Sequence, residues 1–447
     1  MPTPVDDFLK AATIPRDRFH ASGNLDAANA LLLKHPELPG ENIFTAAVTG
    51  DAEAVKAFIE KDPSLVTQKG GPHNWDALTY LCFSLYLQWD ASRSEDFVKA
   101  AKLLLDAGAD ANSGFWEPEH RPGAEWEPVL YGAAGIAHHP GVTNVLLQAG
   151  ADPNAGEVVY HSPETRDNET IKLLIASGKL TEDSRLLMLI RKHDWHDEDG
   201  VKLLLETGLD PNKKRKLGKT AMLHGILRDN GAIIIQLLLD HGADPTVSYE
   251  DVNPFQLAAR RGRGDLLALF EQYGFSYEFS GAEILIAPCA RNDERTIQDI
   301  MLNEPQLVEQ VLAQGGKLLG EFAGNANVDG VRHLLDLGVP ITAQYPGDGY
   351  FGIPPHSMAL HIACWRAWPP VVRFLIERGA PLNIKDGMHR TPLMLAILAC
   401  VDSYWMYRRN TSSIEALLDA GAYAGDILLP TGYPEADQLI EKHLSRS

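Results

Sequence analysis

A short apolar phrase that ends in glycine recurs along this chain and constrains its fold more than any other feature. The copies are LLLDAGAD (103–110), VLLQAGAD (145–152), LLLETGLD (203–210), LLLDHGAD (237–244), FLIERGAP (374–381) and ALLDAGA (416–422). Each copy is typical of the last turn of an apolar helix that a left-handed glycine terminates. A helix and its stop, repeated along a chain, predict a solenoid rather than a single globular core.

The glycines that end these helices recur at a regular interval. They are Gly108, Gly150, Gly178, Gly208, Gly242, Gly274, Gly338, Gly379 and Gly421. Most neighbours are 28 to 42 residues apart, so the unit is about 33 residues long and the longer intervals carry insertions. The gap between Gly274 and Gly338 holds a diverged unit, residues 284–308, which mirrors residues 43–66 and has a Pro-containing stop in place of glycine.

This pattern predicts an all-α chain in three parts. We expect capping helices over residues 1–40, a continuous repeat array over 41–425 and a C-terminal capping helix over 426–447. Within the array, a short helix and a second helix rich in Ile and Leu form each unit, and stacking on neighbouring units buries the apolar faces. The first cap is expected as a helix pair near Leu25–His35, and the last as a helix over Glu435–Leu444.

Composition and charge exclude several classes of protein. With 40 basic and 60 acidic residues the formal net charge is −20, which disfavours non-specific attraction to nucleic acid or anionic lipid. No apolar run approaches the roughly 20 residues that span a bilayer, and the acidic N-terminus is unlike a secretory signal. We therefore expect a cytoplasmic monomer with no membrane partner. Wide spacing among apolar neighbours predicts buried free thiols at Cys82, Cys289, Cys364 and Cys400.

The units resemble the ankyrin repeat. Its T-P-L-H-x-A signature is matched by TPLMLA (391–396), MALHIA (358–363), TAMLHG (220–225), NPFQLA (253–258) and EPVLYG (127–132), and its G-A-D-x-N end by GADAN (108–112) and GADPN (150–154). The resemblance runs from about residue 21 to the C-terminus. It implies an ankyrin-type helical repeat solenoid with short β-hairpin finger loops. The N-terminal half is also similar to a group of bacterial ankyrin proteins, which implies a common scaffold and no chemistry.

The resemblance further implies which side chains face the concave groove. The column just after the signature His position reads Tyr80, Tyr131, His161, His224, Leu257, Ile362 and Leu395. One helical turn later the column reads Lys192, Arg228, Arg261 and Arg366. Arginine along one surface of an acidic protein suggests an anionic ligand or an acidic partner segment. The alternative is that these cations sit at solvated helix ends, where they meet the helix dipole favourably.

Longer loops and polar clusters are the remaining candidates. Residues 88–96, 113–125, 344–355 and 401–413 lengthen their loops, and aromatic side chains in or beside them suggest a lined groove: Trp116, Trp126, Tyr345, Tyr350 and Phe351. Ordinary loop insertion is the alternative. The metal-ligand types in His193–Asp199 lie in a turn and lack helical i, i+4 spacing, so no metal is predicted there. The basic stretch Lys213–Lys216 is interpreted as a solvated loop rather than a nucleic-acid site.

Two functions follow from these patterns. The favoured one is a non-enzymatic recognition scaffold with no cofactor, metal or catalytic residue. It binds a protein or peptide through the concave groove and finger loops, and an acidic partner is one of the options. Its contact residues are predicted to be Tyr80, Trp116, Trp126, Tyr131, His161, His224, Arg228 and Arg261. The alternative is a small-ligand or enzymatic pocket in the region of Trp75, Glu117, Trp126, Tyr131, Tyr160, His161 and His193. A closed pocket with two acid/base groups in mutual reach would favour the alternative.

Overall fold

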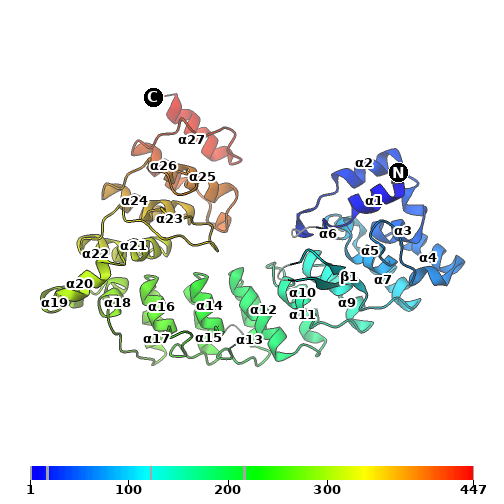
Figure 1. Cartoon of the computed structure of the whole chain (residues 1–447), viewed down its shortest axis with the longest axis horizontal. Coiled ribbons are helices and arrows are strands. Elements are labelled where there is room, and N and C mark those ends of the chain that lie inside the picture. The colour runs from blue at the N-terminus through cyan, green and yellow to red at the C-terminus, as the bar shows by residue number, and fades with distance from the viewer. Residues whose placement is uncertain (1–2, 17–19, 121–122, 215–217, 446–447) are drawn as a thin grey trace. The chain divides into compact units, whose positions relative to one another are not determined.

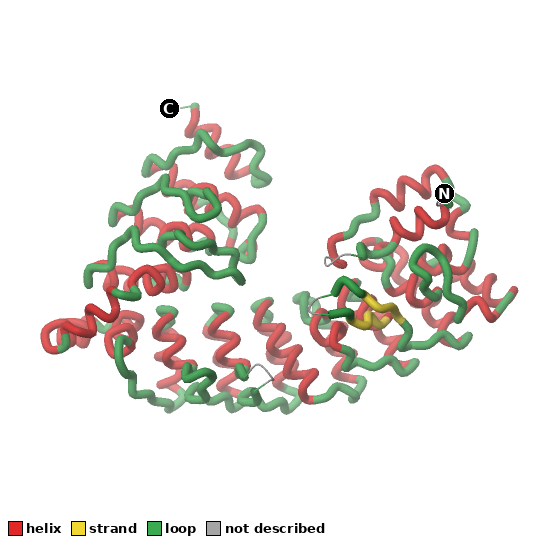
Figure 2. Tube along the Cα trace, viewed as in Figure 1, coloured by secondary structure: helices red, strands yellow, loops and turns green. Residues whose placement is uncertain are grey.

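A computed structural model describes residues 3–16, 20–120, 123–214 and 218–445 of the chain. It divides into two compact units, Met1–Ala243 and Asp244–Ser447. Helices dominate both units (Figures 1 and 2). The expected all-α, ankyrin-type helical repeat is confirmed. The predicted division into two caps and one continuous array stays a prediction.

The first unit consists of helix pairs. Its helices are α1 (Pro4–Ala12), α2 (Asp26–Lys34), α3 (Ile43–Thr49), α4 (Ala52–Lys61), α5 (Ala77–Cys82), α6 (Leu85–Trp89), α7 (Ser94–Asp106), α8 (Val129–Tyr131), α9 (Pro140–Gln148), α10 (Gly156–His161), α11 (Glu169–Ala176), α12 (Glu182–Asp194), α13 (Glu198–Leu205), α14 (Ala221–Leu227) and α15 (Ala232–Asp240). Short helices η1 (His20–Ser22), η2 (Leu38–Gly40), η3 (Pro63–Val66), η4 (Ala91–Arg93) and η5 (Gly132–Ile136) join them. Helices α3, α5, α8, α10, α12 and α14 each pack against the next, and so do α4, α7, α9 and α11.

The pair α14 and α15 shows why the sequence folds in this way. The hydroxyl of Thr220 caps α14 by accepting a hydrogen bond from the backbone N–H of Leu223. Helix α15 turns its Ile and Leu stripe inward and buries Ile234 and Leu238. Gly242 then adopts a φ of 87°, which a residue with a side chain rarely adopts. The other eight glycines in the predicted series also have positive φ, so the predicted helix ends are confirmed.

The sheet found among the described residues is a single two-stranded hairpin. Strands β1 (Gly114–Glu117) and β2 (Glu125–Pro128) pair antiparallel. Strand β1 lies within the insertion predicted at residues 113–125, β2 begins at its last residue, and β2 leads directly into α8. The predicted short finger hairpin is therefore present at this position.

The second unit repeats the helix-pair design. Its helices are α16 (Pro254–Arg260), α17 (Gly264–Gln272), α18 (Glu283–Arg291), α19 (Glu294–Asn303), α20 (Pro305–Leu312), α21 (Gly315–Gly324), α22 (Val328–Asp336), α23 (Ala359–Trp365), α24 (Pro369–Glu377), α25 (Pro392–Val401), η6 (Met406–Arg408), α26 (Ser412–Asp419) and α27 (Pro434–Leu444). The diverged unit predicted at 284–308 forms α18 and α19, and α20 begins at the proline of its stop. Helices α21, α23 and α25 pack in sequence, and α27 packs on α26.

Three further expectations can be compared with the structure. All four cysteines are free and buried, as predicted. Helices α2 and α27 cover the two segments expected to form caps, and α1 is an additional helix that the repeat pattern did not indicate. Among the described residues, no helix is both long and apolar enough to cross a membrane.

Candidate functional site

The two faces of the β1–β2 hairpin have opposite character. In the antiparallel register Trp116 pairs with Trp126, whereas Phe115 pairs with Glu127. Because side chains alternate along a strand, the tryptophans lie on one face and Phe115, Glu117 and Glu127 on the other. The two indole rings meet edge to face at 5.6 Å, and Trp116 is 63% exposed. The hairpin thus presents an aromatic pair to solvent while its other face is buried.

The buried face is held by an arginine from the N-terminal segment. The Nε–H of Arg16 donates a hydrogen bond of 2.7 Å to Glu117 Oε2. The same guanidinium lies 4.5 Å from the centre of the Phe115 ring, which stacks on Trp75 at 4.4 Å. A charged pair combined with ring contacts fixes the hairpin more firmly than an exposed ion pair would.

Glu127 lies in the middle of this buried face. Its side chain is fully buried, and neither carboxylate oxygen has a hydrogen-bond partner. Burial raises the pKa of Glu127, and the nearby carboxylate of Glu157 raises it further, to about 8. A buried carboxyl without a partner is costly, so it marks a position where the protein gives up stability.

His161 at the end of α10 connects two carboxylates. Its Nε2 lies 3.0 Å from Glu157 Oε2 and its Nδ1 lies 3.0 Å from Glu164 Oε2. Burial alone lowers the pKa of His161, but the hydrogen bonds to Glu157 and Glu164 outweigh burial and raise it to about 9. The imidazolium therefore donates from both nitrogens at neutral pH. The ring of Tyr131 lies 5.2 Å away, so His161 is the meeting point of the charged and aromatic groups.

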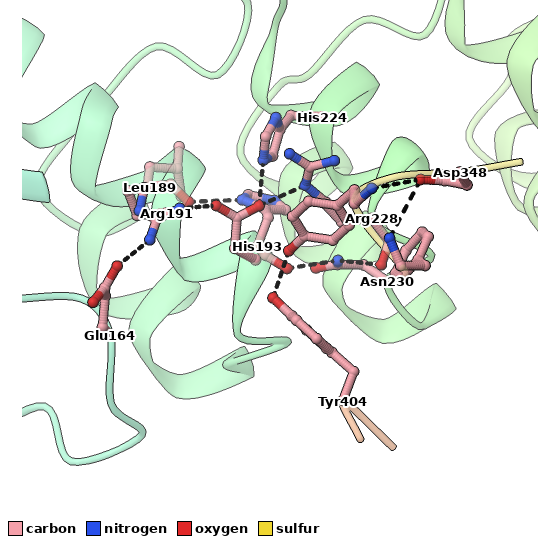
Figure 3. A network of polar contacts seen from close by, with 12 residues as sticks. Glu164, Leu189, Arg191, His193, His224, Arg228, Asn230, Asp348 and Tyr404 are labelled. Atoms are coloured by element: carbon pink, nitrogen blue, oxygen red, sulfur yellow. Dashed lines mark hydrogen bonds and ion pairs between the residues drawn. The ribbon is translucent and has the colours of Figure 1, made fainter. Parts of the chain in front are cut away.

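A chain of ion pairs continues from His161 toward α14. Arg191 bridges Glu164 and Asp194, as Figure 3 shows for its contact with Glu164. Asp194 also accepts hydrogen bonds from His224 Nε2 at 2.8 Å and from Arg228 Nε at 2.6 Å. Burial raises the pKa of Asp194, but these partners outweigh burial and hold the pKa well below its usual range. Asp194 is therefore a permanent anion at the centre of a basic cluster.

This pairing corrects the expectation of a free basic surface. Arg228 is paired with the buried Asp194, and Lys192 is fully buried with its Nζ 2.7 Å from Asp197. In the second unit, Arg261 is buried and lies 3.1 Å from Glu321, which also accepts a hydrogen bond from Tyr345. Carboxylates from neighbouring helices thus neutralise these cations, and the predicted attraction for an acidic partner loses its basis.

Several predicted groove residues are part of the packed interior. Tyr80 is fully buried and its hydroxyl donates to the carbonyl of Gly70, and Tyr131 is also buried. Tyr345 and Phe351, expected in a lined groove, belong to a buried cluster around Trp405. Arg366 is buried as well, with its guanidinium over the Phe351 ring. The expectation that these side chains line an open groove is not met, because helix packing buries Tyr80, Tyr131 and Arg366. Tyr345 and Phe351 belong to the buried cluster that contains Trp405.

His161 and His224 are partly exposed, as are Trp126 and Arg228. The polar cluster 193–199 has a structural role. His193 is buried, its Nδ1–H donates to the carbonyl of Leu189 at 2.7 Å, and Asp197 caps α13. Of the basic stretch Lys213–Lys216, residues 215 and 216 lie outside the described residues.

The residues proposed for an alternative pocket are only partly brought together. Glu117, Tyr131 and His161 belong to the cluster described above, and Tyr160 packs edge to face on His161. Trp126 lies on the opposite face of the hairpin, and His193 is part of the α12 packing.

Sequence reasoning missed Glu127, although a signal was present. Glu127 occupies the first position of the signature, where Thr220 and Thr391 cap their helices. Helix α8 instead begins after Pro128 without any side-chain cap. A glutamate at a capping position that does not cap is a residue with another role.

The comparisons with known proteins agree with the geometry. Residues 357–387, which include α23 and α24, match the family model described as Ankyrin repeat. The chain therefore contains an ankyrin repeat. Ankyrin repeats generally serve as scaffolds for protein–protein interaction.

Three relatives illustrate how far the similarity extends. An ankyrin repeat-containing protein of Treponema pallidum (strain Nichols) is 29% identical over 113 residues, which are 23% of this chain and 38% of that protein. An ankyrin repeat protein of Acanthamoeba polyphaga mimivirus is 35% identical over 77 residues, 17% of this chain and 47% of that protein. The ankyrin repeat domain of human ASB11 aligns with 53% of this chain and 98% of its own, at 19% identity and a TM-score of 0.24. This chain thus spans less than half of either curated relative.

Proposed function

We propose that this ankyrin repeat protein is a non-enzymatic recognition scaffold that anchors a protein or peptide partner on Trp116 and Trp126. The observation that supports this is the exposed Trp116 indole on a hairpin whose other face is buried. Tryptophan buries a large area on binding and loses little conformational entropy, so it is enriched among residues that dominate binding energy. The Arg16–Glu117 pair and the Phe115–Trp75 stack hold the hairpin in place before binding, which lowers the cost of association.

The proposed anchor is narrower than the surface predicted from the sequence. Tyr80, Tyr131 and Arg261 are buried, so they support the scaffold rather than contact the partner. His161, His224 and Arg228 keep partial exposure and can contribute polar contacts at the edge of the interface. An acidic partner segment is no longer part of the proposal.

The test compares two exposed tryptophans of the same chain. Partners retained by the full chain from its native cell extract are identified by mass spectrometry, and their affinity for wild type, W116A and W89A is measured by calorimetry. We expect W116A to weaken binding by at least about 2 kcal/mol, as for an interface anchor. Trp89 on α6 is 54% exposed and serves as the matched control, so W89A should bind as wild type. Equal affinity of W116A and wild type would contradict the anchor.

A further inference from the structure

Glu127 does not stand alone on the buried face of the hairpin. One ligand atom from each of His120, Glu127 and Glu157 lies within 4.8 Å of the other two. They come from three separate segments: the loop after β1, strand β2 and the first turn of α10. Three metal-ligating side chains thus converge on one point, and one of them is fully buried with both oxygens unpartnered.

The hydrogen bond made by Nδ1 of His120 leaves the Nε2 atom available as a metal ligand. Its Nδ1 lies 3.3 Å from the carbonyl oxygen of Gly123, so Nδ1 carries the proton and donates it to that carbonyl. The Nε2 atom therefore presents its lone pair, and it lies 3.6 Å from Glu157 Oε1. A histidine whose second nitrogen is tied to a carbonyl is the usual form of a metal ligand.

Glu157 is oriented by a group behind it. The Nε2–H of His161 donates to Glu157 Oε2 at 3.0 Å, while Oε1 faces His120. Glu117 is already paired with Arg16, and Glu164 with His161 and Arg191. Glu127, in contrast, has no hydrogen-bond partner. Of these four carboxyl groups, Glu127 is therefore the one without a hydrogen-bonding or ion-pair partner.

We propose that His120, Glu127 and Glu157 bind one divalent transition-metal ion, with Zn²⁺ as the best-fitting member of that class. An imidazole with two carboxylates favours Zn²⁺ over Mg²⁺ and Ca²⁺, which prefer all-oxygen ligand sets. Three protein ligands leave the fourth tetrahedral position to water. The ion cross-links the hairpin to α10 and so fixes the loop after β1.

The distances between the ligand atoms determine how these atoms must move when a metal ion binds. Ligand atoms around a tetrahedral ion with bonds of about 2.1 Å lie about 3.4 Å apart. The three ligand atoms lie within 4.8 Å of one another, so any pair that is farther apart than about 3.4 Å must approach when the ion binds. His120 lies in a loop and is partly exposed, so it is the ligand that moves.

The test uses the tag-free full chain, stripped of metal with a chelator and titrated with ZnCl₂. We expect wild type to bind one equivalent of Zn²⁺, measured by calorimetry and elemental analysis, and to prefer it strongly over Mg²⁺. E127Q and H120A should each weaken binding at least tenfold. Bound Co²⁺ should give the visible absorption of a four- or five-coordinate ion in wild type, and this absorption should disappear in E127Q.

The control is a second His–Glu pair of the same chain. His35 Nδ1 lies 3.2 Å from Glu37 Oε1, and both side chains are largely exposed. E37Q should bind Zn²⁺ as wild type does. Thermal melts of the metal-free variants verify that E127Q and H120A are folded. The proposal is overturned if wild type binds no Zn²⁺ more tightly than Mg²⁺, or if wild type, E127Q and H120A bind it equally well.

Discussion

The buried imidazole of His193 makes the stability of the first unit depend on pH. The side chain is fully buried in α12; its Nδ1–H donates to the carbonyl of Leu189 and its Nε2 has no hydrogen-bond partner. Burial lowers the pKa of His193 to about 4. Protonation would place a charge at Nε2, next to the backbone of Gly225 on α14, where an added Cβ would lie 2.7 Å from the ring. The folded chain therefore keeps His193 neutral.

The size and the sign of the effect follow from the two pKa values. Because the folded pKa is below the unfolded value of about 6.5, the unfolded chain binds more protons in mildly acidic solution. The contribution of neutral His193 to the unfolding free energy is fully present above about pH 6.5 and is lost as the pH falls toward 4. At about 1.36 kcal/mol per pKa unit, a change from pH 7 to pH 5 removes about 1.8 kcal/mol through this side chain.

The assay is urea unfolding at pH 7, 6 and 5, compared between wild type and H193N. Asparagine keeps a donor for the carbonyl of Leu189 but does not titrate, so H193N should lose about 1.8 kcal/mol less than wild type over this range. Other buried histidines, such as His73, contribute equally to both chains and cancel. Parallel curves for wild type and H193N would refute the reasoning.

Two further predictions concern helix ends and buried charge. G242V should lower the unfolding free energy by about 1 kcal/mol or more, because φ is 87° at this position. G40V should change the unfolding free energy little, because Gly40 has neither a left-handed φ nor close neighbours. Equal melting temperatures of the two variants would contradict this prediction. R261S should cost about 3 kcal/mol, because it leaves the buried carboxylate of Glu321 without its cation, whereas R373S at an exposed position should be silent in the same melts. A silent R261S would contradict this reasoning.

The fold was largely predictable because its signals are local. A glycine such as Gly242 ends its helix through its own backbone freedom, and the Ile and Leu stripe of α15 lies within nine residues. Both are visible in a single stretch of sequence. Free buried cysteines were predictable for the same reason, since each lies among apolar neighbours.

The site was less predictable because its partners are distant in sequence. Arg228 contacts Asp194 of the preceding repeat, and Arg261 contacts Glu321, sixty residues later in the sequence. The basic column predicted from the register of the repeats is therefore a set of neutral ion pairs. The burial of Tyr80 depends on Gly70 and His73 in the preceding loop. Glu127 resembles an ordinary hairpin residue until the strand register places it beside Phe115 on the inner face.

The four buried thiols give this chain internal reporters of its own motion. Only a thiolate is alkylated, and burial raises the pKa of Cys82 and Cys289, so labelling in native buffer requires local opening. Cys82 lies in the first unit and the other three in the second. The relative labelling rates of these peptides, read by mass spectrometry, therefore reveal which unit opens first, without any mutation or attached probe.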